Sequence, residues 1–220
     1  FRLFYIQPIG NLELSDMTLT GGSAYNPADP DDLLTNSGGA ILNLGHLVVN
    51  KSRITQNTAH EGGGIDNRNQ MTLSFVTVDS NNASGGGKAG AGLHNRGIAT
   101  IENSTFSNNG KLVGETTDGI FTNGTLEMTN STVSSNGVTG IDNEGEVTLN
   151  HVTIAFNGVG AFASCGDLTI SNSIIAQPPG TSGCSCQTIH PVFPNLDTTG
   201  TCAGMLVKMN ALQLGPLAHY

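Results

Sequence analysis

The chain has few charged and few aromatic side chains for its length. Of 220 residues, 11% are charged and 5% are aromatic, and tryptophan is absent. A soluble domain usually carries about 25% charged residues, so much of this surface is expected to be neutral and polar. The net charge of −9, with only eight Lys and Arg, argues against nucleic acid and anionic lipid as partners, because both need clustered cations.

Long apolar runs are also lacking. No stretch approaches the roughly 20 apolar residues that span a bilayer, so we expect no membrane span in this chain. The first residue is Phe1 rather than Met, which indicates a mature or excised piece whose export signal, if one exists, would lie upstream.

What the chain does have is repetition. The stretches "IDNRNQMTLSFVTVDSNN", "LHNRGIATIENSTFSNN" and "IFTNGTLEMTNSTVSSN" follow one another along the sequence. We align the repeats on the residue after an "IxNx" pattern. These seven anchors are Gly10, Gly45, Asn69, Gly97, Gly124, Gly145 and Gly166.

Four columns of the alignment are apolar in every repeat. They lie four residues before the anchor and two, four and nine residues after it. In the third repeat they are Ile65, Met71, Leu73 and Val78. Between them, apolar and polar residues alternate with the period of a β-strand.

A repeat of 21 residues cannot bury its own apolar face, but stacked repeats can. We therefore predict an all-β fold: a right-handed parallel β-helix, or β-solenoid, of about seven rungs. Leucine-rich repeats fit less well because helical segments are lacking, and an antiparallel sandwich would not keep one register through seven repeats.

Asparagine columns are expected at the corners, because Asn tolerates the left-handed backbone region that sharp turns need. Stacked Asn side chains can also bond to one another from coil to coil. The first column, twelve residues after the anchor, holds Asn57, Asn81, Asn109, Asn136 and Asn157. The second, two residues before it, holds Asn43, Asn67, Asn95 and Asn143.

A third Asn column, six residues after the anchor, holds Asn103, Asn130 and Asn172 and is a candidate for another ladder. The "NST" triplets at Asn103 and Asn130 also match the signal for N-glycosylation. We favour the architectural interpretation.

The stretch "GGAILNLGHLVVNKSRITQNTAHEGGGIDNRNQMTLSFVTV" resembles the repeat of right-handed parallel β-helix proteins of bacterial cell surfaces. That group includes the polymorphic outer-membrane-protein-like repeats and the choice-of-anchor Q proteins, whose units run close to "GGGIYNxGxLTLxNSTxSGN". The resemblance covers about residues 5–177, and the segment from "NSIIAQPPGTSGCSCQ" onward is similar to the tail of the same group. It implies the fold and an extracellular or cell-surface location, and it transfers no catalytic residue.

We predict two regions, a β-helix over residues 1–177 and a C-terminal tail over 178–220 that caps the last rung. The four cysteines all lie in the last quarter: Cys165, Cys184, Cys186 and Cys202. In an exported chain, two disulfides that hold the tail to the last rung are expected, because the spacing does not suit zinc. We favour Cys165 joined to one of the close pair and Cys202 joined to the other.

Three long insertions leave the repeats at the same corner, at residues 23–39, 82–91 and 110–118, so we expect them on one edge of the solenoid. The first insertion contains Asp29, Asp31 and Asp32. These carboxylates are candidate calcium ligands, but a solvated acidic loop is the favoured interpretation. No cofactor is otherwise expected.

One cluster could carry chemistry. Asp66 and His94 should lie on adjacent rungs, as should Arg68 and Arg96, and Asp142 and Glu144 occupy the same two columns further along. An acid, a base and two cations could hold a sugar carboxylate and abstract a proton. A mixed-charge surface looks the same in sequence, and we favour it, so no catalytic residue is assigned.

Two functions follow. The first is an exported structural or adhesive module: a surface stalk, a fibre or filament subunit that contacts itself end to end, or a surface that contacts polysaccharide. The alternative is a lyase, epimerase or hydrolase that acts on acidic sugars in a groove on the side of the solenoid.

Overall fold

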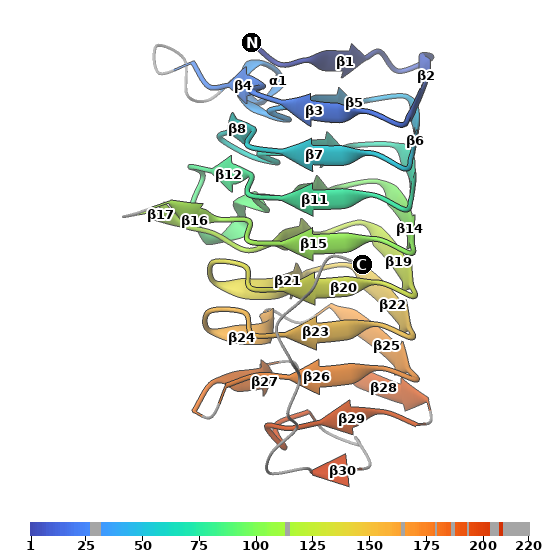
Figure 1. The fold of residues 1–220 in the computed structure, drawn as a ribbon, viewed down its shortest axis with the longest axis vertical. Helices are drawn as coiled ribbons and strands as arrows, with labels where there is room; N and C mark the ends of the chain where they lie inside the picture. The colour runs from blue at the N-terminus through green and yellow to red at the C-terminus, as the bar shows by residue number, and fades with distance from the viewer. Residues whose placement is uncertain are drawn as a thin grey trace.

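The computed structural model describes residues 1–26, 32–112, 115–163, 166–178, 180–185, 188–192, 194–202 and 207–208. Over these residues the chain forms an elongated stack of parallel β-coils (Figure 1). The predicted parallel β-solenoid is therefore confirmed.

Each coil adds one strand to each of three sheets, in chain order. Sheet A contains β1 (Phe4–Ile6), β5 (Ile41–Asn43), β9 (Ile65–Asn67), β13 (Leu93–Asn95), β18 (Ile120–Thr122), β21 (Thr139–Asn143), β24 (Gly160–Ala163) and β27 (Ser182–Cys184). Sheet B contains β2 (Asn11–Ser15), β6 (His46–Asn50), β10 (Gln70–Ser74), β14 (Ile98–Glu102), β19 (Thr125–Thr129), β22 (Glu146–Asn150), β25 (Asp167–Ser171) and β28 (Ile189–Val192). Sheet C contains β3 (Thr18–Thr20), β7 (Arg53–Thr55), β11 (Thr77–Asp79), β15 (Thr105–Ser107), β20 (Thr132–Ser134), β23 (Thr153–Ala155), β26 (Ile174–Ala176), β29 (Leu196–Asp197) and β30 (Val207–Lys208).

The insertions form small elements at one edge of the stack, as expected (Figure 1). These elements are α1 (Leu33–Asn36), η1 (Gly87–Ala89), the strands β4 (Ser23–Ala24) and β12 (Asn82–Ala83), and the antiparallel pair β16 (Lys111–Leu112) and β17 (Glu115–Thr116). The strand β8 (Thr58–Ala59), from the shorter connection between the first two insertions, lies between β4 and β12 in a small parallel sheet. These elements leave the opposite corner, between sheets B and C, free of long loops.

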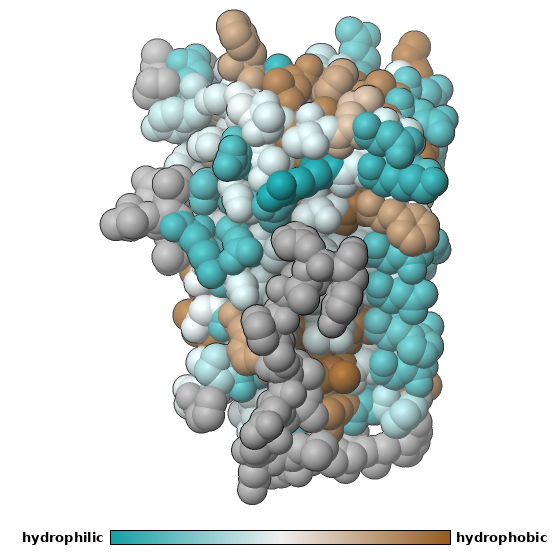
Figure 2. Space-filling view, viewed as in Figure 1, coloured by the Kyte–Doolittle hydropathy of each residue, from teal (hydrophilic) through white to brown (hydrophobic). Residues whose placement is uncertain are grey.

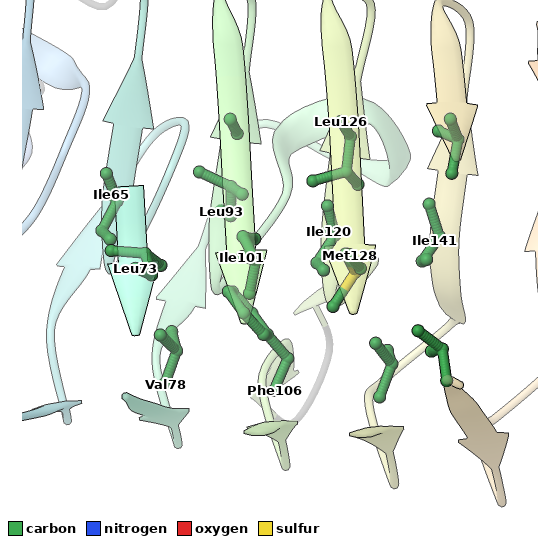
Figure 3. Close-up of a cluster of buried hydrophobic side chains, with 14 of the residues drawn as sticks. Ile65, Leu73, Val78, Leu93, Ile101, Phe106, Ile120, Leu126, Met128 and Ile141 are labelled. Carbon is green, nitrogen blue, oxygen red and sulfur yellow. The ribbon is translucent and has the colours of Figure 1, made fainter. Parts of the chain in front are cut away.

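The four apolar columns point into a single core. Met71 pairs with Leu47 on one side and Ala99 on the other, and all three are buried. Figure 3 shows the same stacking for the columns of Ile65 and Leu73. Because parallel coils repeat about every 4.8 Å, each inward side chain packs on its equivalents above and below.

The alignment is wrong in one place. In sheet A the partner of Ile41 is Phe4, not Ile6, and Ile6 pairs with Asn43. The first repeat has two more residues between this strand and its anchor, Gly10, than the later repeats have. Ile6 therefore occupies the position of the Asn column and is buried there.

The sheets continue past residue 177. Strands β27, β28 and β29 add to sheets A, B and C, so the first part of the predicted tail is a further coil. A disulfide joins Cys184 to Cys202, in agreement with the favoured pairing of Cys202 with one of the close pair. Cys165 and Cys186 lie outside the described residues.

The first predicted Asn ladder is present in full, and the second is present from Asn43 to Asn95, whereas Asn143 donates its side-chain NH₂ to the Asp167 carbonyl instead. In the first, each Asn donates its side-chain NH₂ to the side-chain oxygen of the next, at 2.9 Å from Asn57 to Asn81 and 3.1 Å from Asn81 to Asn109. The ladder continues through Asn136 to Asn157 with every member buried. The second ladder runs from Asn43 through Asn67 and Asn95, after which Thr122 takes the place of Asn.

The Asn residues of the first ladder do not adopt the left-handed conformation that was expected of them. At the corner of the first ladder, the left-handed residue is the one before each Asn, such as Gln56 before Asn57. Asn103, Asn130 and Asn172 are left-handed themselves, with φ near 50°, and do not stack into a ladder. The ladder at their corner is formed instead by the next residue, as when the Ser104 amide donates to the Ser131 hydroxyl at 3.1 Å.

Candidate functional site

The candidate cluster lies on the outer face of sheet A. Here Leu42, Asp66, His94, Phe121 and Asp142 follow one another in register on successive strands. The strand period requires these side chains to point away from the core, yet each is at most 5% exposed. This outer column is therefore packed, not an open face.

Asp66 is the centre of the cluster and is fully buried. Arg68 donates to its Oδ2 from Nε at 3.0 Å and from Nη2 at 2.9 Å. Arg96 donates from Nη1 to both carboxylate oxygens at 2.9 Å. The sequence prediction that these residues meet is therefore correct, and the two guanidinium groups share one carboxylate.

Glu61 and Ser37 extend the network beyond the residues singled out from the sequence. Arg96 donates its Nη2 to Glu61, and Arg68 donates its Nη2 to the Ser37 hydroxyl at 3.2 Å. Burial, the largest single influence, would raise the pKa of Glu61, but the hydrogen bond from Arg96 and the nearby charges of Arg96, His94 and His60 together lower it. Glu61 lies in the variable segment before "GGG", so no repeat column marked it.

His94 lies between Asp66 and Phe121 on adjacent strands. Its ring meets the Phe121 ring edge-to-face with centroids 4.8 Å apart. Neither ring nitrogen has a hydrogen-bond partner among the residues that the structure describes. Burial, with the positive charge of Arg96 second, lowers the pKa of His94 to about 4. At neutral pH this side chain is an uncharged, packed imidazole.

A second carboxyl, Asp118, was not recognised from the sequence. It is 2% exposed and accepts hydrogen bonds from the Thr139 amide at 3.0 Å and hydroxyl at 2.5 Å. Burial raises the pKa of Asp118 to about 7, and the nearby Asp142 adds to the rise. Glu144, which occupies the same outward column as Arg68 and Arg96, forms an ion pair with Lys88 at the surface.

In this arrangement the charged side chains of the cluster bind one another, which disfavours a catalytic role for them. A general base needs a lone pair within reach of substrate, but both Asp66 oxygens already accept from guanidinium groups. The arginines that would hold a sugar carboxylate bind Asp66, Glu61 and Ser37.

The calcium candidates are only partly described. Asp29 and Asp31 lie outside the described residues. Asp32 caps α1, and its Oδ1 accepts from the amides of Leu34 at 2.9 Å and Thr35 at 3.3 Å. Among the described residues, no group of three or more His, Cys, Asp or Glu side chains is placed to hold a metal ion.

Comparison with protein-family models, curated proteins and solved structures found no match. Within the described residues, no helix is long and apolar enough to cross a membrane.

Proposed function

We propose that this chain is an exported structural and adhesive β-solenoid module, which acts as a stalk or fibre subunit and contacts polysaccharide. The observation that carries the proposal is the continuity of three sheets and a buried Asn ladder from coil to coil. Such a rod needs no cofactor to keep its shape or to present its neutral faces.

The end of the first coil supports end-to-end contact. Exposed apolar side chains gather there, including Leu3, Tyr5 and Ile9, and Ile9 is 94% exposed. Figure 2 shows several brown, apolar side chains among paler and teal ones at the N-terminal end of the rod. Strands β1, β2 and β3 also have no neighbour on their outer side in the described part of the chain.

Export and membership of the bacterial cell-surface group remain parts of this proposal. The resemblance in the repeats and the disulfide support them, because structural disulfides persist mainly outside the reducing cytosol. Detection of the protein on intact cells with an antibody, before and after surface proteolysis, tests the location.

Electron microscopy of the purified protein tests the rod and its assembly. We expect rods that join end to end, and we expect the double variant Leu3→Lys/Ile9→Lys to leave single rods. Val159→Lys is the matched control, since Val159 is 59% exposed on the side of the stack. Filaments that persist in Leu3→Lys/Ile9→Lys would contradict end-to-end assembly.

The lyase alternative is tested separately by the absorbance of unsaturated uronides released from acidic polysaccharide, with and without calcium. We expect no release, because the candidate base is held by two arginines. Release that depends on Asp66 and His94 would replace the structural proposal with an enzymatic one.

A further inference from the structure

A shallow groove of about 580 Å³ runs along the corner between sheets B and C. Its side chains come from three successive coils: Asp16 and Met17, then Lys51 and Arg53, then Phe75. Backbone bonds join these coils at the corner, from the Asp16 amide to Asn50 and from the Lys51 amide to Ser74. The positions of the side chains along the groove are therefore set by the stacking of the solenoid.

Phe75 is an unusual residue for this corner. Its φ is 56°, in the left-handed region that bulky side chains avoid, and its side chain is 57% exposed. The same corner position in the other repeats holds only polar residues: Asp16, Lys51, Asn103, Asn130, His151 and Asn172. Backbone conformation and solvation would both favour Asn here, so an outward aromatic ring points to a binding role.

The polar groups beside Phe75 are balanced between donors and acceptors. Arg53 binds Asp79 through Nε and Nη2, each at 2.7 Å, and its Nη1 is not part of that pair. Lys51 forms no ion pair with any residue that the structure describes. Asp16 accepts from the Ser15 hydroxyl at 2.6 Å through Oδ2, so Oδ1 remains as an acceptor.

The charges at the groove sum to zero, since the two positive charges of Lys51 and Arg53 are balanced by the two negative charges of Asp16 and Asp79. A local balance of this kind does not select an ion, and the net charge of −9 repels polyanions. An aromatic face beside mixed donors and acceptors suits a ring with one apolar face and several hydroxyl groups, each of which can donate and accept.

We propose that this corner groove binds a neutral pyranose unit of a polysaccharide, with the sugar's C–H face stacked on Phe75 and its hydroxyl groups bonded to Lys51, Arg53 and Asp16. The inference rests on the glycan-contacting part of the proposed function and gives that contact a place and a ligand class.

Affinity electrophoresis tests it, with the protein run through gels that contain dextran, laminarin or galactomannan as neutral polymers, and alginate or polygalacturonate as acidic ones. We expect retardation by at least one neutral polymer and little by the acidic ones. Phe75→Asn should weaken the apparent affinity at least tenfold while Tm stays equal or rises, because Asn suits the left-handed backbone.

Phe156→Asn is the matched control, since Phe156 is also left-handed and 44% exposed but lies at the other end of the sheet C strands. It should bind as the wild type does. Binding unchanged in Phe75→Asn, preference for the acidic polymers, or no retardation by any neutral polymer would each overturn the inference. Rods seen by microscopy would leave the structural part of the proposed function standing in all three cases.

Discussion

At the scale of single residues, this chain buries many polar side chains and satisfies most of them through its neighbours above and below. Asn109 is typical: its Oδ1 accepts from the amide and the side chain of Asn81, and its Nδ2 donates to Val78 and Asn136. Because the ladder has the period of the coil, each Asn supports two neighbouring coils.

Replacing Asn109 with Ala should therefore leave several buried groups without partners. Each unsatisfied group costs about 1–3 kcal/mol, so we expect Asn109→Ala to lower the free energy of unfolding by at least about 3 kcal/mol in urea titrations. Asn11→Ala, at an exposed position of β2, should change it by less than about 0.5 kcal/mol. Similar losses in the two variants would show that the ladder contributes little.

His94 should make the protein less stable in mild acid. The unfolded chain takes up a proton on this imidazole near pH 6.5, but the folded chain does so only near pH 4. Stability from this group is thus lost as pH falls between these values, by up to about 3 kcal/mol. We expect His94→Leu to flatten that part of the stability profile measured by urea unfolding, and an unchanged slope would rule out a buried neutral imidazole.

Asp118 should have the opposite pH dependence: its contribution to the stability of the protein should fall as the pH rises. Its folded pKa near 7 lies above the ordinary value of 3.8, so its stability contribution is full below pH 3.8 and is lost as pH rises through 7. Asp118→Asn keeps the acceptor for Thr139, so its stability relative to wild type should increase between pH 4 and pH 8, by on the order of 4 kcal/mol. The same difference at both pH values would contradict the shift.

At the scale of elements, the turn between sheets A and B depends on close backbone contact between coils. A Cβ on Gly145 would lie 2.1 Å from the carbonyl oxygen of Gly124, and a Cβ on Gly166 would lie 2.0 Å from that of Gly145. The anchor column is therefore rich in Gly because the coils leave no space for a side chain there.

Gly145→Ala should lower stability by about 1–3 kcal/mol in thermal or urea unfolding, since backbone must move to admit the methyl group. Gly10 in the first coil is the control from the same column. Its Cβ would have its nearest neighbour at 3.1 Å, so Gly10→Ala should cost clearly less. Equal effects of the two substitutions would argue against contact between coils as the cause.

At the scale of the whole molecule, the disulfide joins the start of the coil formed by β27, β28 and β29 to the segment that follows β29. Cys184 pairs in register with Phe162 of the core column, and its bond to Cys202 spans 18 residues of sequence. A loop of this length corresponds to about 3 kcal/mol in the chain-entropy view.

We expect the double variant Cys184→Ala/Cys202→Ala to lose hydrogen-exchange protection over β27 and β29 first, while β10 in the middle of the rod stays protected. Solenoid coils contact mainly their neighbours, so opening should begin at the end. Uniform loss of protection along the rod would contradict this.

The repeat in the sequence was sufficient to predict the fold, because each inward column must be apolar and must recur once per coil. It also predicted the Asn ladders and the meeting of Asp66 with Arg68, Arg96 and His94, since residues in one column become neighbours when coils stack. The left-handed positions were misplaced by one residue, because Asn has two roles at these corners and sequence does not separate them.

Only the tertiary structure decided which partners the outward-facing side chains of these columns acquire. Glu61 and Ser37 reach the cluster from segments outside the repeat, so no periodicity could place them, and they help complete the pairing of the arginines. The corner groove likewise exists only once three coils are stacked, when Phe75, Lys51 and Asp16 come to one surface from positions up to 59 residues apart. Repetition along the chain determines which residues are neighbours across coils, but the irregular segments and the exposed side chains acquire their partners only in three dimensions.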